Sequence, residues 1–178
     1  STGALAFASS GSPVLTVGGG VFIGSNGNTG RTGSITFQSG STLIASSITL
    51  GGTGTTPAAG TITMTNGGTL KVNDLINGTG TRTWTPGTGT VEITDNTTLP
   101  SATFTSFNNL TISSGKTVTS GVRFSVGGTI TVTGSFVPGA TSHVISGAGT
   151  LTGTGSIDVN LVSTTALTTQ YNITTKTL

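Results

Sequence analysis

The sequence predicts an all-β protein, a parallel β-solenoid with coils of about 27 residues, which is a period typical of stacked repeats. Three observations support this fold: apolar residues alternate with threonine or serine, glycine-rich breaks separate the alternating segments, and one strand motif recurs at a nearly constant spacing. Alternation with a period of two is typical of a half-buried strand, and glycine clusters indicate turns or corners. Because threonine and glycine are both poor helix formers, we expect no helix.

The alternation is clearest in four segments that each begin with a glycine. They are residues 33–37, 60–65, 89–93 and 128–133, in which Ile, Val, Met or Phe occupies every second position. A strand with this pattern turns its apolar side chains to one face and its hydroxyl groups to the other. Breaks are expected at residues 18–20, 51–52, 66–68 and 127–128. The tail, residues 166–178, is expected to form a last strand.

A strand motif repeats along the chain. The pattern Gly-(Ser/Thr)-(Ile/Val)-x-(Phe/Met/Ile) begins at Gly33, Gly60 and Gly89, and weaker echoes at Lys116 and His143 continue the same nearly even spacing. A period of this size indicates stacked repeats. In a three-sided coil of this length, small and apolar side chains fill a narrow core, Thr and Ser cover the outside, and each coil covers the next.

One copy of the motif does not fit this period, because it begins at Gly128, between the first and the second position that the spacing predicts after Gly89. An antiparallel β-sandwich is therefore the alternative fold, since it would contain the same short strands and glycine turns. No shift in composition indicates a linker, so residues 1–178 are interpreted as one all-β unit. That unit is either a mature subunit or a fragment of a larger assembly.

The composition restricts the chemistry that this chain can perform. Of 178 residues, 42 are Thr, 21 are Ser and 30 are Gly, whereas 6 are basic, 4 are acidic, one is His and none is Cys. Without cysteine, disulfides and thiolate metal sites are excluded. The basic residues are spread singly and form no patch for nucleic acid. The longest apolar runs fall far short of the roughly 20 residues that span a bilayer, so we expect no membrane span.

An acid–base enzyme would have to use Asp74, Glu92, Asp95, Asp158 or His143. Glu92 and Asp95 lie close together at a strand end and could both face a groove. A solvent-facing strand position for Glu92 and a turn that starts at Asp95 are the favoured interpretation. The tandem Gly and Asp of repeat-type calcium loops is missing. We therefore expect no catalytic residue, no cofactor and no metal ion.

Two further features suggest binding surfaces. Trp84 alternates with threonines beside Arg82, which suggests stacking on a glycan or on a neighbouring subunit, or a cap on the core. Three Thr-x-Thr rows, at residues 61–65, 81–85 and 129–133, would order water and bind ice if they were stacked flat. Because threonine is simply favoured at exposed strand positions, ice binding is a minor alternative.

One segment resembles a known class of proteins. Residues 97–115 contain Phe107-Asn108-Asn109-Leu110-Thr111-Ile112, and residues 126–132 follow with Val-Gly-Gly-Thr-Ile-Thr-Val. This pattern is similar to the degenerate Thr/Gly-rich β-repeats of large bacterial surface adhesins and extracellular fibre proteins. The resemblance implies an exported, extended β-structure at the cell surface or in an extracellular fibre. No catalytic residue carries over, because the pattern contains none.

Together these observations predict a non-enzymatic extracellular structural or adhesive protein: a filament, sheath or surface-layer subunit, or an adhesin segment. Exposed strand edges can pair with other chains, and low charge favours close packing of identical copies. The expected partners are copies of the chain in a homo-polymer and a glycan or host-surface ligand. The expected assembly contacts are the residues of the two strand-like ends, Ala4, Leu5, Ala6 and Phe7 at one and Tyr171 and Ile173 at the other. A carbohydrate-binding or carbohydrate-cleaving β-solenoid is the alternative.

Overall fold

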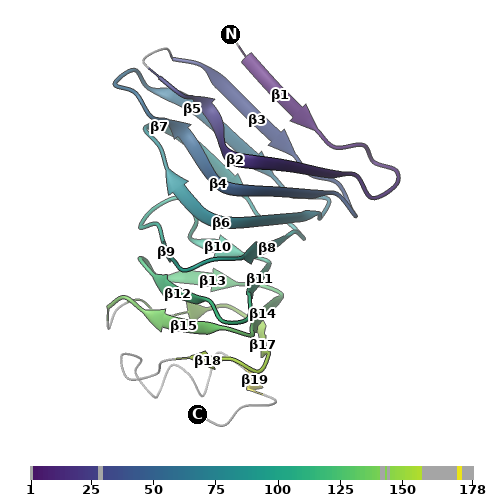
Figure 1. The fold of residues 1–178 in the computed structure, drawn as a ribbon, viewed down its shortest axis with the longest axis vertical. Coiled ribbons are helices and arrows are strands. Elements are labelled where there is room, and N and C mark those ends of the chain that lie inside the picture. The colour runs from purple at the N-terminus through teal and green to yellow at the C-terminus, as the bar shows by residue number, and fades with distance from the viewer. Residues whose placement is uncertain (1, 28–29, 141–142, 144, 158–171, 174–178) are drawn as a thin grey trace.

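The computed structural model describes residues 2–27, 30–140, 143, 145–157 and 172–173 and shows stacked coils along one long axis (Figure 1). These residues form nineteen strands and no helix. Every pairing between named strands is parallel, from β1 on β3 to β17 on β19. The parallel β-solenoid is confirmed. The antiparallel sandwich is wrong, because the antiparallel contact in the described residues is a single isolated bridge between Gly52 and Thr79.

The N-terminal coils each contain two strands, one of them long. In order, these strands are β1 (Thr2–Ala6), β2 (Val14–Ser25), β3 (Thr32–Thr36), β4 (Thr42–Gly52), β5 (Ala58–Thr63) and β6 (Thr69–Asn77). The later coils contain three short strands each. These are β7 (Gly80–Thr85), β8 (Thr90–Ile93), β9 (Thr97–Leu99), β10 (Ser106–Phe107), β11 (Asn109–Ile112), β12 (Thr117–Ser120), β13 (Phe124–Val126), β14 (Thr129–Val132), β15 (Ser135–Pro138), β16 (Ile145–Ser146), β17 (Thr150–Thr152) and β18 (Ser156–Ile157), followed by β19 (Asn172–Ile173).

Four sheets run along the stack. Sheet I has the order β1-β3-β5-β7, and sheet II is the eight-stranded sheet from β2 to β19. Sheet III has the order β18-β15-β12-β9, and sheet IV has the order β10-β13-β16. Sheet I therefore ends at β7, and sheet IV begins in the next coil with β10.

The coil length changes along the axis. In the N-terminal coils Thr2 lies beside Thr32 and Thr42 lies beside Thr69, so the expected period describes this part of the stack. From β6 onward the coils are shorter: Val118 lies beside Phe136 and Thr129 beside Thr150. Their period is roughly 20 residues, at the lower end of the range for stacked repeats. The shortening begins in the coil of β6 and β7, where residues 78–79 connect the two strands, whereas residues 53–57 connect β4 to β5 in the coil before.

This shortening explains the motif copy at Gly128. Val91, Leu110 and Ile130 lie in one column of sheet II, in three successive short coils. The copy at Gly128 thus lies two short coils after the copy at Gly89 and occupies the same position in its coil. The echoes at Lys116 and His143 do not continue the repeat, because the strands that follow them, β12 and β16, belong to sheets III and IV.

The core consists of apolar columns formed by parallel, in-register pairing. One column begins at Leu15 in β2 and continues through Leu43, Leu70, Val91, Leu110, Ile130 and Leu151. From Leu43 to Leu151 its members are 0–6% exposed. Each side chain is covered by the coils before and after it, so stability arises from stacking between neighbours.

A column of glycines lets sheet I approach sheet II closely. Gly3, Gly33 and Gly60 lie side by side in β1, β3 and β5. A Cβ atom on Gly33 would lie 2.6 Å from the backbone nitrogen of Gly24, and one on Gly60 would lie 2.6 Å from that of Gly51. A side chain at either position would have to push the two sheets apart.

Candidate functional site

The first coil leaves the solenoid open at its N-terminal end. β1 is the edge strand of sheet I and β2 is the edge strand of sheet II, and both lie at the same end of the stack (Figure 1). Leu5 pairs in register with Ile35, and Leu15 pairs with Leu43. Leu5 and Leu15 are each 36% exposed, whereas Ile35 is 4% and Leu43 is 1% exposed. The inner column is therefore uncovered at this end.

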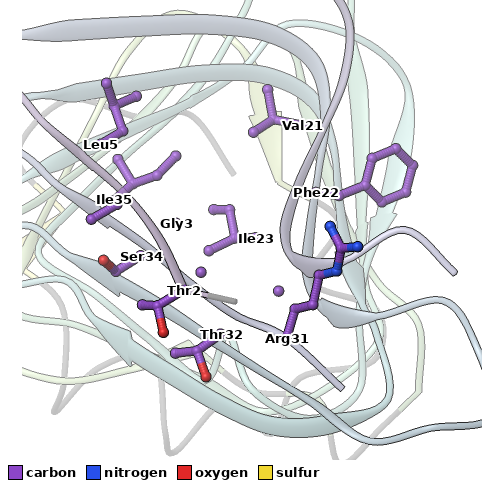
Figure 2. Close-up of a pocket in the computed structure, with 13 residues that line it drawn as sticks. Thr2, Gly3, Leu5, Val21, Phe22, Ile23, Arg31, Thr32, Ser34 and Ile35 are labelled. Atoms are coloured by element: carbon purple, nitrogen blue, oxygen red, sulfur yellow. The ribbon is translucent and has the colours of Figure 1, made fainter. Parts of the chain in front are cut away.

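A hollow of about 380 Å³ lies between β1, β2 and β3. Figure 2 shows the side chains of Leu5, Ile23 and Ile35 around it, while Phe22 points away. Thr2, Arg31, Thr32 and Ser34 are also among its lining residues. Arg31 is the one charged residue in positions 1–70 of the sequence. The hollow is thus an apolar surface with a polar rim.

The predicted N-terminal contacts fall on this coil with one exception. Ala4, Leu5 and Ala6 lie on β1 and are exposed. Phe7 is 8% exposed, and the centre of its ring lies 5.2 Å from that of Phe37. The Phe7 side chain therefore belongs to the core, and only its three predecessors are placed to contact another molecule.

The predicted C-terminal contacts are only partly described. Ile173 belongs to β19, where it lies beside Leu151 of β17. Tyr171 lies outside the described residues.

Several exposed apolar residues on β2 were not predicted. Val14 is 63% exposed and Phe22 is 42% exposed. The sequence signal was present in the apolar runs on both sides of Gly18-Gly19-Gly20, but the glycines were interpreted as a break. In the structure these glycines lie inside β2, where the register on β4 shifts between Val17 and Gly20. A Cβ on Gly18 or Gly19 would meet nothing within 4 Å, so this stretch of backbone is accessible.

Trp84 lies at the junction where sheet I gives way to sheet IV. The centre of its ring lies 5.2 Å from that of Phe104 and 6.1 Å from that of Phe107, both edge-to-face. Its Nε1–H donates a hydrogen bond to the carbonyl oxygen of Ser106 at 2.7 Å. These contacts favour the core-capping interpretation of Trp84 over a platform for glycans.

We expect Trp84→Ala to lower the free energy of unfolding by about 3 kcal/mol, because it empties the junction of a large ring. Trp84→Phe is the control, since it keeps an aromatic ring and loses the indole N–H, and should cost about 1 kcal/mol. Urea denaturation followed by circular dichroism measures both. Unchanged stability in Trp84→Ala would contradict the packing role.

Glu92 and Asp95 each form an ion pair with a lysine of a neighbouring coil. Glu92 forms an ion pair with Lys71 at 2.9 Å and accepts a hydrogen bond from the Ser113 hydroxyl at 3.1 Å. Asp95 forms an ion pair with Lys116 at 2.9 Å. The hydrogen bond from Lys116 lowers the pKa of Asp95, and the backbone N–H of Asn96 lowers it further. These contacts link successive coils along the surface.

The remaining described candidates for acid–base chemistry form other hydrogen bonds. Asp74 accepts a hydrogen bond from the Thr97 hydroxyl. The Nδ1–H of His143 donates to the carbonyl oxygen of Ser120 at 2.8 Å. Asp158 lies outside the described residues. Within the described part of the chain, no three His, Cys, Asp or Glu side chains are grouped to hold a metal ion.

The Thr-x-Thr rows lie on two different sheets. Thr61 and Thr63 of β5 lie beside Thr83 and Thr85 of β7. These four threonines form a small grid on sheet I. The third row belongs to sheet II, where the Thr131 hydroxyl pairs with that of Thr152 at 3.1 Å. The rows thus do not form one surface.

Comparison with known proteins gives no family: no protein-family model, curated protein or solved structure matches this chain. The likeness to adhesin repeats therefore rests on the residues of the sequence. Among the described residues, no helix is long and apolar enough to cross a membrane.

Proposed function

We propose that this protein is a non-enzymatic structural or adhesive module of the cell surface or an extracellular fibre, which assembles with its own copies through open strand edges. One observation carries the proposal: the first coil leaves two strand edges and an apolar rung uncovered, at the end of otherwise continuous ladders. Such an edge is a template for pairing with another chain.

The two edge strands lack most of the features that normally block pairing. Natural edges are protected by charged side chains, proline, β-bulges or very short strands, and of these β2 has the register shift between Val17 and Gly20. β1 has the sequence TGALA and β2 has VLTVGGGVFIGS, so neither contains a charged residue or a proline. At 12 residues, β2 is also the longest strand of the described residues. A long edge without charge or proline favours assembly.

The low charge of the chain also supports assembly. The formal net charge is +2 over 178 residues, so identical copies repel one another only weakly. The charged groups that pair, such as Lys71 with Glu92, lie on later coils and leave the first coil neutral apart from Arg31.

Negative-stain electron microscopy and size-exclusion chromatography of the 178-residue chain test this function. We expect elongated particles that are larger than one chain and whose population grows with protein concentration. Single-chain particles at every concentration would contradict assembly. Binding to a glycan array that Trp84→Ala abolishes, in protein whose circular dichroism spectrum is unchanged, would support the carbohydrate alternative instead.

A further inference from the structure

We propose that the outer face of sheet I binds ice. This face extends the four threonines of β5 and β7 to β3, and we call it the hydroxyl grid. It consists of every second residue of β3 from Thr32 to Thr36, of β5 from Ala59 to Thr63 and of β7 from Thr81 to Thr85. All of these positions except Ala59 are Thr or Ser. The inference goes beyond the proposed function, because a single chain carries the whole surface.

The hydroxyl grid is regular in two directions. Across the strands, Ser34 lies beside Thr61 and Thr61 lies beside Thr83, and the three strands pair without a shift in register. Neighbouring strands lie about 4.8 Å apart, and the side chains on one face of a parallel strand repeat about every 6.6 Å. Both repeats are close to spacings between water molecules in the surface planes of hexagonal ice. The grid can therefore hold a layer of water in an ice-like arrangement.

The hydroxyl grid faces outward from a rigid base. Burial alternates along β5, so that Thr61 and Thr63 are partly exposed while Ile62 between them is 1% exposed. On the inner side, Gly33 and Gly60 bring sheet I against the backbone of sheet II. Close packing of this kind fixes side chains in place, so the grid keeps its spacing when it meets a solid surface.

The hydroxyl grid itself is uncharged. Arg82 is the one charged residue of β3, β5 and β7, and it alternates with Thr81 and Thr83, so it points to the other face. There its Nε–H donates a hydrogen bond to the Thr103 hydroxyl at 2.7 Å, and its Nη1 donates to the carbonyl oxygen of Gly78. Charged groups give up their own hydration water only at a high cost. A face without charge is therefore suited to a lattice of neutral water molecules.

Threonine provides two groups that ordered water can use. Its hydroxyl group both donates and accepts hydrogen bonds, and its methyl group orders the water around it. In the part of the chain that the structure describes, the grid hydroxyls form no hydrogen bond with other protein groups, whereas on sheet II Thr131 bonds to Thr152 at 3.1 Å. Trp84, the one aromatic residue of these strands, packs against the core. The grid thus presents hydroxyl groups to water and no ring to a sugar.

Nanolitre osmometry of the 178-residue chain tests the inference through thermal hysteresis, which is the gap between the melting and freezing temperatures of an ice crystal in the solution. We expect a measurable gap and faceted crystals. Thr61→Lys and Thr83→Lys should each lose most of the gap, because a lysine stem extends into water and holds the lattice away from the neighbouring threonines. Thr111→Lys is the matched control, since Thr111 is a partly exposed threonine on β11 of sheet II, and it should keep the full gap.

Slow freezing of the solution measures binding directly. The intact chain and Thr111→Lys should enter the growing ice, whereas Thr61→Lys and Thr83→Lys should stay in the liquid. Circular dichroism establishes that each variant keeps its strands, and the two grid variants lie on different strands, so a folding defect in one leaves the other informative. Exclusion of the intact chain from ice would overturn the inference. Full hysteresis in both folded grid variants, or an equal loss in Thr111→Lys, would also overturn it.

Discussion

Replacing Gly60 with alanine is expected to lower the free energy of unfolding by about 3 kcal/mol, because the added methyl group overpacks a closed contact. The new Cβ would meet the carbonyl oxygen of Ile23, and would lie 2.6 Å from the Gly51 nitrogen and 2.8 Å from the Leu50 side chain. Two of these three neighbours are backbone atoms, which move only when sheet I and sheet II separate.

Gly3→Ala is the matched control for this prediction. Gly3 occupies the same column as Gly60, two coils earlier, but a Cβ there would meet nothing within 4 Å. We expect its stability to stay within about 0.5 kcal/mol of the intact chain. Urea denaturation followed by circular dichroism compares the two variants. An equal loss in both would show that the close approach of the sheets does not set the cost.

Leu70→Ala should destabilise the protein by about 3 kcal/mol, because it leaves a cavity in the middle of the core column. Leu70 is 0% exposed and lies between Leu43 and Val91. Leu15→Ala removes the same atoms at the open end of the column, where the side chain is 36% exposed, and should cost about 1 kcal/mol.

The difference between these leucine variants also reports on assembly. Leu15 is partly exposed only because no coil covers it, so a second copy would bury it. We expect the cost of Leu15→Ala to increase with protein concentration, since binding stabilises the folded state by mass action. A concentration-independent cost equal to that of Leu70→Ala would contradict the open column.

The alternation of apolar and hydroxyl residues was sufficient to predict the strands, and the recurrence of the motif at Gly33 and Gly60 predicted their parallel stacking, since these two glycines lie side by side in β3 and β5. Residues 60–65 and 128–133 contribute to strands β5 and β14 with their apolar side chains buried, as expected. The pattern determines which face is buried because successive side chains of a strand point to opposite sides.

The coil length could not be predicted throughout, because it depends on turns and corners that the strand motif does not encode. Gly89 continued the spacing of Gly33 and Gly60 in the sequence, yet Gly60 lies beside Arg82 and not beside Gly89. The connection between the two strands of a coil shortens from residues 53–57 after β4 to residues 78–79 after β6, and this change leaves the alternation within the strands as it was.

The candidate site was predicted in part for a related reason. The exposed side chains of β1 could be inferred from a strand-like chain end, but β2 was divided by its three glycines. Glycine is normally a breaker of regular structure, and here the register shift accommodates it within one strand. Only the pairing of β2 with β4 reveals that Val14 and Phe22 share one edge strand.

Amide hydrogen exchange at low and high protein concentration tests assembly through the open coil most directly. We predict that the amides of β1 and β2 become protected as the concentration rises, while those of β14 in the interior of the stack keep the same protection. Protection of β1 and β2 that is identical at both concentrations, in protein that has assembled, would contradict the open coil as the contact surface.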